Sequence, residues 1–329
     1  MNLPLFSALF AAFALTLYVL LDGFDLGVGT LLLAQRDARS RDLMVDAIAP
    51  TWDGNETWLV MAGIALFAGF PIAYGILLPA VYLPLIVMLL ALAVRGVTFE
   101  FRVQSTNFKP AWDVAFGIAS LVAALAQGTM AGTLILGVHV EAGQFAGSVL
   151  DALSPLALAT GCALLAGYVM LGAGWLRVKE SGELRTFAGR ALHSSNLALL
   201  ALLALVCVSA AAVQPEIRLR LADRWIGLSL LAILTLGSAA AAWRSVSGNS
   251  DLRPFAFAAL QCALVAMGAW LVVYPDVVPF RLSLWDAASA QASHMFLLAG
   301  AAVFAPIIIA YSAFAYRVFR GKTSAEGYE

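Results

Sequence analysis

Nine apolar runs, each about 20 residues long or longer, constrain the fold of this 329-residue chain more than any other feature. About 20 mostly apolar residues form a helix that can cross the hydrocarbon core of a bilayer. The runs are continuously apolar and do not alternate with a period of two, which favours helices over a membrane barrel. They occupy residues 5–34, 53–70, 75–101, 111–137, 154–176, 190–213, 224–243, 254–274 and 287–316.

Charged residues make up only 12% of the chain, whereas a soluble domain carries about 25%. This excludes a soluble globular protein, and the net charge of −1 argues against a nucleic-acid partner. The longest connections, near 35–52 and 177–189, are short enough to lie along the membrane surface and too short to separate domains. The sequence therefore predicts an all-α polytopic membrane protein with nine transmembrane helices, folded as a single transmembrane domain over residues 1–329.

Lys and Arg in the connections predict the orientation of this domain. The connections on one side carry 14 of them, those on the other side carry 4, and Arg95 lies within the third run. Since cytoplasmic loops are enriched in Lys and Arg, the amino terminus is expected outside and the carboxyl terminus in the cytoplasm. Trp-Asp pairs at 52–53 and 285–286 each precede an apolar run, an internal echo that two four-helix bundles plus one extra helix would accommodate.

Asp22 and Asp25 lie within the first apolar run, where charged residues are costly. Their spacing places both on one face of a helix, roughly 25 Å from its start. Two carboxylates so close in a low dielectric are not expected to ionise together, so one should hold a proton. Gly23 and Gly27 would let another helix approach closely. The alternative is an interfacial pair bonded to an arginine or to backbone amides.

A second polar cluster opens the next run, with Asp53, Asn55 and Glu56 between Trp52 and Trp58. One interpretation is helix initiation, with Asp53 as N-cap, Glu56 at N3 and the tryptophans at the membrane interface. The other is a proton path, because four hydrogen-bonding or ionisable groups exceed what a cap requires.

A third cluster ends the third run, with Arg95, Glu100 and Arg102. Arg95 could extend outward to the interface or pair with Asp22, Asp25 or Glu100. The histidines, His139, His193 and His294, are scattered without the spacing that brackets a metal or haem, and the three cysteines are expected to fill the core.

Four ordered motifs resemble subunit II of the cytochrome bd-type quinol oxidases. They are DGFDLGVG at 22–29, IAPTWDGNETW at 48–58, RGVTFEFR at 95–102 and SLWDAASAQ at 283–291. The resemblance covers the chain essentially from end to end. The compact loops and residues 120–128 are closer to the cyanide-insensitive branch of that family.

The resemblance implies a terminal respiratory oxidase of the prokaryotic cytoplasmic membrane, which oxidises quinol and reduces O2 to water. Haem b and haem d belong to subunit I, a homologous partner in a heterodimer, and this chain binds none directly. Asp53 would then be a proton-path carboxylate at the subunit interface, supported by Asp22 and Asp25, and Trp58 would lie near an oxygen entrance. The resemblance leaves room for a small single-helix accessory subunit and for a structural quinone or lipid.

Family members vary at the position of Glu56, which makes its part in the path less secure than that of Asp53. Two other functions remain open. A proton-coupled secondary transporter could use the same carboxylates, although Pro71, Pro79 and Pro84 interrupt only one region and no repeat signature matches them. A purely structural assembly subunit is the other alternative.

Overall fold

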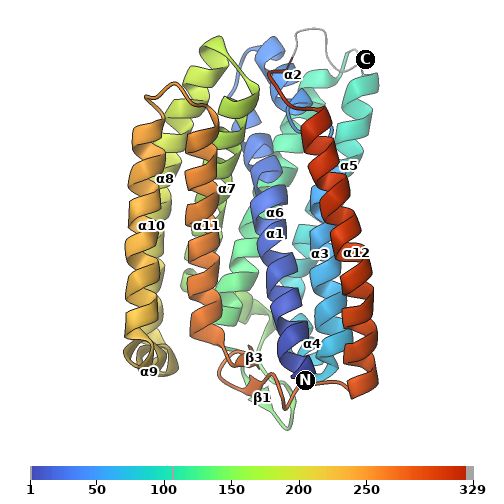
Figure 1. The fold of residues 1–329 in the computed structure, drawn as a ribbon, viewed down its shortest axis with the longest axis vertical. Helices are drawn as coiled ribbons and strands as arrows, with labels where there is room; N and C mark the ends of the chain where they lie inside the picture. Colours follow the sequence, from blue (N-terminus) through green and yellow to red (C-terminus); the bar gives the residue numbers. More distant parts are fainter. Residues whose placement is uncertain (1, 106, 324–329) are drawn as a thin grey trace.

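The computed structural model describes residues 2–105 and 107–323, in which long helices run side by side (Figure 1). Two short hairpins and one 3-10 helix join them at one end. The elements are α1 (Leu3–Leu32), α2 (Ala38–Asp46), α3 (Trp52–Gly69), α4 (Pro71–Ala80), α5 (Tyr82–Gln104), α6 (Lys109–Leu136), β1 (Val140–Glu141), β2 (Gln144–Phe145), η1 (Val149–Leu153), α7 (Pro155–Lys179), α8 (Gly182–Val213), α9 (Pro215–Asp223), α10 (Trp225–Ser245), α11 (Leu252–Val273), β3 (Asp276–Val278), β4 (Leu282–Ser283) and α12 (Gln291–Val318).

The predicted all-α, polytopic architecture is confirmed. Eight helices of the described chain are long and apolar enough to cross a membrane, namely α1, α5, α6, α7, α8, α10, α11 and α12. The helix α3 is not among them, because its 18 residues open on the polar segment 52–57. It nevertheless packs along α1 and α12 in the same bundle (Figure 1).

The helix predicted over 75–101 is wrong in its boundaries, because the structure contains two helices in this region, α4 and α5. The break falls at Val81, between Pro79 and Pro84. A proline has no N–H for the helical ladder and its ring clashes with the preceding turn. The paired prolines therefore end one helix and begin another.

The helix α1 lies at the centre of the bundle, against α3, α6 and α7 (Figure 1). Its contact with α7 is as close as the glycine spacing predicts. A Cβ added at Gly27 would lie 1.8 Å from the carbonyl oxygen of Tyr168, and one at Gly23 would lie 2.7 Å from its ring. On one side of the bundle α7 packs against α8 and α11. On the other side α12 packs against α3.

The connection before α3 folds into the bundle instead of lying along the membrane surface as expected. Met44 and Ile48 are fully buried, and Trp175 Nε1 donates to the carbonyl oxygen of Ala47 at 2.9 Å. As a result the first turn of α3 lies against α1, where Asn55 contacts Asp25, seven residues or roughly 10 Å before the end of that helix. The polar residues that open α3 are thereby placed at the depth of Asp25.

Three arginines lie on the amino-terminal side of the bundle, where the predicted orientation leaves few basic residues. Each of them binds carbonyl oxygens at the end of a helix. Arg218 donates to the carbonyl oxygens of 211–212 at the end of α8. Arg220 and Arg224 donate to carbonyl oxygens of 271–274 at the end of α11. The last carbonyls of a helix have no partner within it, so α9 supplies the caps for two neighbours.

Candidate functional site

Three helices bring their charged residues together in the bundle. Arg95, on α5, donates from Nη2 to Asp22 Oδ1 on α1 at 2.7 Å and to Glu56 Oε2 on α3 at 3.1 Å. Arg95 is 1% exposed and Asp22 is 0% exposed, whereas the Glu56 side chain is 28% exposed. Arg95 therefore points inward to the carboxylates and does not extend to the interface.

Asp25 lies beside this ion pair but has no cation in contact among the described residues. Its Oδ2 accepts from Asn55 Nδ2 at 2.8 Å, and Asn55 Oδ1 accepts from the Tyr316 hydroxyl at 2.7 Å. Asn55 thus links α1, through Asp25, to α12, through Tyr316. The sequence analysis missed Tyr316, because a tyrosine near the end of a span has the pattern of an interfacial aromatic.

The polar cluster, by which we mean Asp22, Asp25, Asn55, Glu56 and Arg95, contains three carboxyl groups and one cation. Several of its buried atoms have no partner within the described chain, namely Asp22 Oδ2, Asp25 Oδ1 and Arg95 Nε and Nη1. Three full negative charges beside one guanidinium would be costly in a low dielectric. Such a group is suited to binding and releasing protons.

Asp53 and Glu100 do not join the polar cluster. Both are exposed on the outer faces of α3 and α5, and neither carboxylate has a hydrogen bond or ion pair within the described residues. The expectation that Arg95 could pair with Glu100 is wrong, because its contacts are with Asp22 and Glu56. Asp53 does not cap α3 either, since Thr51 holds the N-cap position.

Arg102 belongs to a separate network at the end of α5. It donates from Nε to Asp113 Oδ1 at 2.5 Å and from Nη2 to Asp42 Oδ1 at 2.6 Å. Burial alone would raise the pKa of Asp42, but Lys109 and Arg102 together lower it below its usual value. This network ties α2 to α5 and α6, and no pattern around Asp42 or Asp113 beyond their charge indicates it.

Trp58 is buried at 1% exposed, so it is not an interfacial aromatic. Its indole packs edge-on to Phe13, with ring centroids 5.8 Å apart, and against Ala14 and Ala305. Its Nε1 has no hydrogen-bond partner among the described residues. Trp58 therefore lies in an apolar environment near the polar cluster.

The described part of the chain holds no group of three or more His, Cys, Asp or Glu residues that could bind a metal ion. His294 is buried and bonded to Ser7 at 2.8 Å, and so is not the polar edge residue that its position indicated. Of the cysteines only Cys262 fills the core, because Cys162 and Cys207 are exposed.

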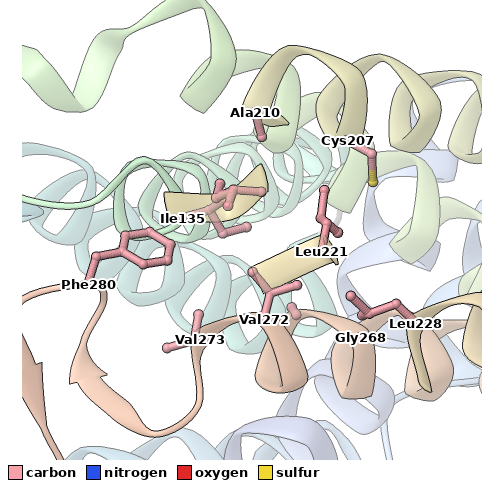
Figure 2. Close-up of a pocket in the computed structure, with 11 residues that line it drawn as sticks. Ile135, Cys207, Ala210, Leu221, Leu228, Gly268, Val272, Val273 and Phe280 are labelled. Carbon is pink, nitrogen blue, oxygen red and sulfur yellow. The ribbon is translucent and has the colours of Figure 1, made fainter. Parts of the chain in front are cut away.

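An apolar cavity of about 150 Å³ lies at the other end of the bundle, beneath α9 (Figure 2). Its lining comes from α6, α8, α9, α10, α11 and the segment after α11, and includes Cys207, Leu221, Val272 and Phe280. The pocket is open to the surface on one side, and its apolar lining suits an apolar guest. It is separate from the polar cluster and offers no group for acid–base chemistry.

Residues 3–319 match the family described as cytochrome bd terminal oxidase subunit II. The chain is 29% identical to cytochrome bd-I ubiquinol oxidase subunit 2 of Escherichia coli strain K12, over 95% of this chain and 93% of that protein. It is 27% identical to cytochrome bd ubiquinol oxidase subunit 2 of Bacillus subtilis, over 93% of each. In the solved structure of bd oxidase from Geobacillus thermodenitrificans, one chain shares the fold with a TM-score of 0.81 at 17% identity, over 97% of this chain and 99% of that one.

Proposed function

Because this chain belongs to the cytochrome bd terminal oxidase subunit II family, we propose that its polar cluster carries protons toward the oxygen-reducing site of the complex. The chain is a membrane-spanning subunit of a quinol:oxygen oxidoreductase and works with subunit I. The single observation that supports the proton path is the placement of two buried carboxyl groups, Asp22 and Asp25, and the half-buried Glu56 beside one cation. Family membership removes the transporter as an alternative, and the cyanide-insensitive branch stays a prediction.

The proposed topology has nine crossings, with α3 as the ninth beside the eight long apolar helices. One four-helix bundle would contain α1, α3, α5 and α6, the other α7, α8, α10 and α11, with α12 as the extra helix. Within the first bundle α1 packs on α3 and α6, and α5 packs on α6; within the second α7 packs on α8 and α11, and α1 and α6 join the two bundles through α7. The amino terminus would lie outside and the carboxyl terminus in the cytoplasm, because the basic connections 36–41 and 177–190 share the carboxyl-terminal end of the bundle.

The path would run from the cytoplasmic side to Asp25, which Tyr316 and Asn55 hold in position through a continuous hydrogen-bonded series. Asp53 would act at the surface of the chain, where subunit I covers it. A carboxylate on the membrane-facing side of a helix is costly against lipid, and the exposed positions of Asp53 and Glu100 therefore support a partner at the α3 and α5 face. Quinol and O2 would be substrates of the complex as a whole.

Among the described residues the three histidines do not face a common space. His139 bonds to Glu141, His193 to the carbonyl oxygen of Trp243 and His294 to Ser7. We therefore assign haem b and haem d to subunit I. The apolar surroundings of Trp58 would suit the passage of O2, and the cavity beneath α9 would suit the hydrocarbon part of a structural quinone or lipid (Figure 2).

The test is quinol oxidase turnover in the assembled complex with Asp25→Asn or Asp53→Asn. The proton path requires a large loss of turnover, on the order of a hundredfold for a proton carrier, with unchanged haem spectra. Asp286→Asn is the matched control, because Asp286 is an exposed carboxylate in the loop before α12. Parental turnover in both Asp25→Asn and Asp53→Asn would favour the purely structural role.

A further inference from the structure

Three buried polar side chains, one each on α1, α6 and α7, take no part in the path proposed above. The one on α1, Tyr18, lies one helical turn before Asp22. Gln127 Nε2, on α6, donates to the Tyr18 hydroxyl oxygen on α1 at 2.6 Å. The Tyr168 hydroxyl, on α7, donates to Gln127 Oε1 at 2.7 Å. Tyr18 and Tyr168 are 2% and 1% exposed. The amide therefore joins two phenols into a directed series that ends on the oxygen of Tyr18.

The direction of these bonds leaves the hydroxyl proton of Tyr18 available. The Tyr18 oxygen accepts from Gln127, and its own O–H donates to no acceptor among the described residues. Asp22 follows four residues later on the same face of α1, and its side chain leans back toward that turn. Asp22 Oδ1 is taken by Arg95, while Oδ2 is buried without a partner. An available donor and an unpaired acceptor thus lie one turn apart, where leaving both unpaired is costly.

We propose that Tyr18 is a positioning residue for Asp22, and that its hydroxyl, oriented by Gln127 and Tyr168, donates to Asp22 Oδ2 through one bridging water molecule. A water with polar partners on both sides is the usual way in which buried groups beyond direct contact are satisfied. Asp22 then receives Arg95 on one oxygen and the Tyr18 hydroxyl, through water, on the other.

The difference between the two aspartates decides which one carries the exchangeable proton. Asp22 is compensated by a full positive charge and a hydroxyl donor, whereas Asp25 receives only the neutral amide of Asn55. The exchangeable proton accordingly resides on Asp25, whose free oxygen Oδ1 can take it. This inference rests on the proposed function and states where the proton waits within the polar cluster. The titratable groups that face Asp22 are Tyr18 and Asp25 on α1, Glu56 on α3, Arg95 on α5, Tyr168 on α7 and Tyr316 on α12.

The test compares Tyr18→Phe, Tyr168→Phe and Tyr274→Phe in the purified, assembled oxidase. Tyr274 is an exposed tyrosine directly after α11, at the other end of the bundle from the polar cluster, and serves as the matched control. Two quantities are measured, the infrared carbonyl band of protonated carboxyl groups and the pH dependence of quinol oxidase turnover. In the parent enzyme Asp25→Asn should remove the band that belongs to this cluster.

Without the Tyr18 hydroxyl, Asp22 shares the proton with Asp25. The band should then survive in part when Asp25→Asn is added to Tyr18→Phe. The acidic limb of the pH profile should move up by about one pH unit, a tenfold loss of turnover on that limb. Tyr168→Phe should give a smaller shift in the same direction, because Gln127 keeps one of its two anchors, and Tyr274→Phe should give none.

Complete loss of the band when Asp25→Asn is added to Tyr18→Phe, together with a parental pH profile in both Tyr18→Phe and Tyr168→Phe, would overturn the proposal. If Tyr18→Phe fails to assemble, Tyr168→Phe carries the test alone, since it removes only the hydroxyl and keeps the ring that packs on Gly23. The two proposals fail separately. Loss of turnover in Asp25→Asn together with unchanged tyrosine variants rejects the positioning role only, whereas parental turnover in Asp25→Asn and Asp53→Asn rejects the path itself.

Discussion

Replacing Arg95 by Met should destabilise the chain strongly, because it removes the only cation in contact with Asp22 and Glu56 among the described residues. The substitution keeps a long apolar side chain but leaves Asp22 buried and uncompensated. Removing one partner of a buried ion pair costs about 3–5 kcal/mol. At roughly 2–4 °C per kcal/mol for a chain of this size class, the unfolding temperature should fall on the order of 10 °C.

The measurement is thermal unfolding of the purified complex, followed by tryptophan fluorescence, for a double-mutant cycle of Arg95→Met and Asp22→Asn. The double variant contains no uncompensated charge at this pair and should recover much of the loss. The coupling energy between the two positions should be about 2–3 kcal/mol. Arg317→Met is the control, since Arg317 lies exposed near the end of α12. A loss under about 1 kcal/mol for Arg95→Met, or a double variant no more stable than Arg95→Met alone, would refute this reasoning.

Three further outcomes can be measured. Gly27→Ala should cost about 3 kcal/mol or prevent assembly, because its Cβ would lie 1.8 Å from a backbone oxygen of α7, whereas Gly237→Ala, where a Cβ meets nothing within 4 Å, should be tolerated in the same thermal assay. Arg220→Ala should speed proteolysis within 274–281, because the carbonyls that end α11 and the carboxylate of Asp276 lose their donor, at a cost of about 1–3 kcal/mol. Burial raises the pKa of Glu180 to about 7. The Glu180 carboxyl has a higher pKa in the folded chain than in the unfolded chain, so below about pH 4.5 it is protonated in both states and has no effect. As pH rises from about 4.5 to 7, the unfolded chain loses this proton more readily, and the free energy of unfolding falls. Glu180→Gln should therefore raise the unfolding temperature at pH 8 and lose that gain at pH 5.

The long apolar runs could be placed from the sequence because they are decided by length and composition alone. The glycine spacing at 23 and 27 also predicted a close helix contact, since the absence of a side chain acts locally. The break at Val81 was harder, because prolines at 79 and 84 can either kink a span or divide it. Only the packing of both pieces decides between these outcomes.

Of the polar cluster, Asp22 and Asp25 on α1 and Asn55 and Glu56 on α3 were singled out from the sequence, but Asp53 was singled out with them and lies outside the cluster. Arg95 had three candidate partners, and the choice of Asp22 and Glu56 depends on how α5 is rotated against α1. Tyr316 joins the cluster from the other end of the sequence, so no local pattern could reveal it. Asp53 and Asn55 are two residues apart, and helix rotation alone turns one outward and the other inward.

The outward position of Asp53 and Glu100 has a consequence for biogenesis. A newly inserted copy without its partner would present these carboxylates near the lipid, on a face where no group of the described chain compensates them. In the assembly proposed above subunit I would cover this face, so the cost would fall only on unassembled chains. Surplus copies are therefore the less stable ones and the better substrates for membrane proteases, which would let degradation match the amounts of the two subunits without any separate control of their synthesis.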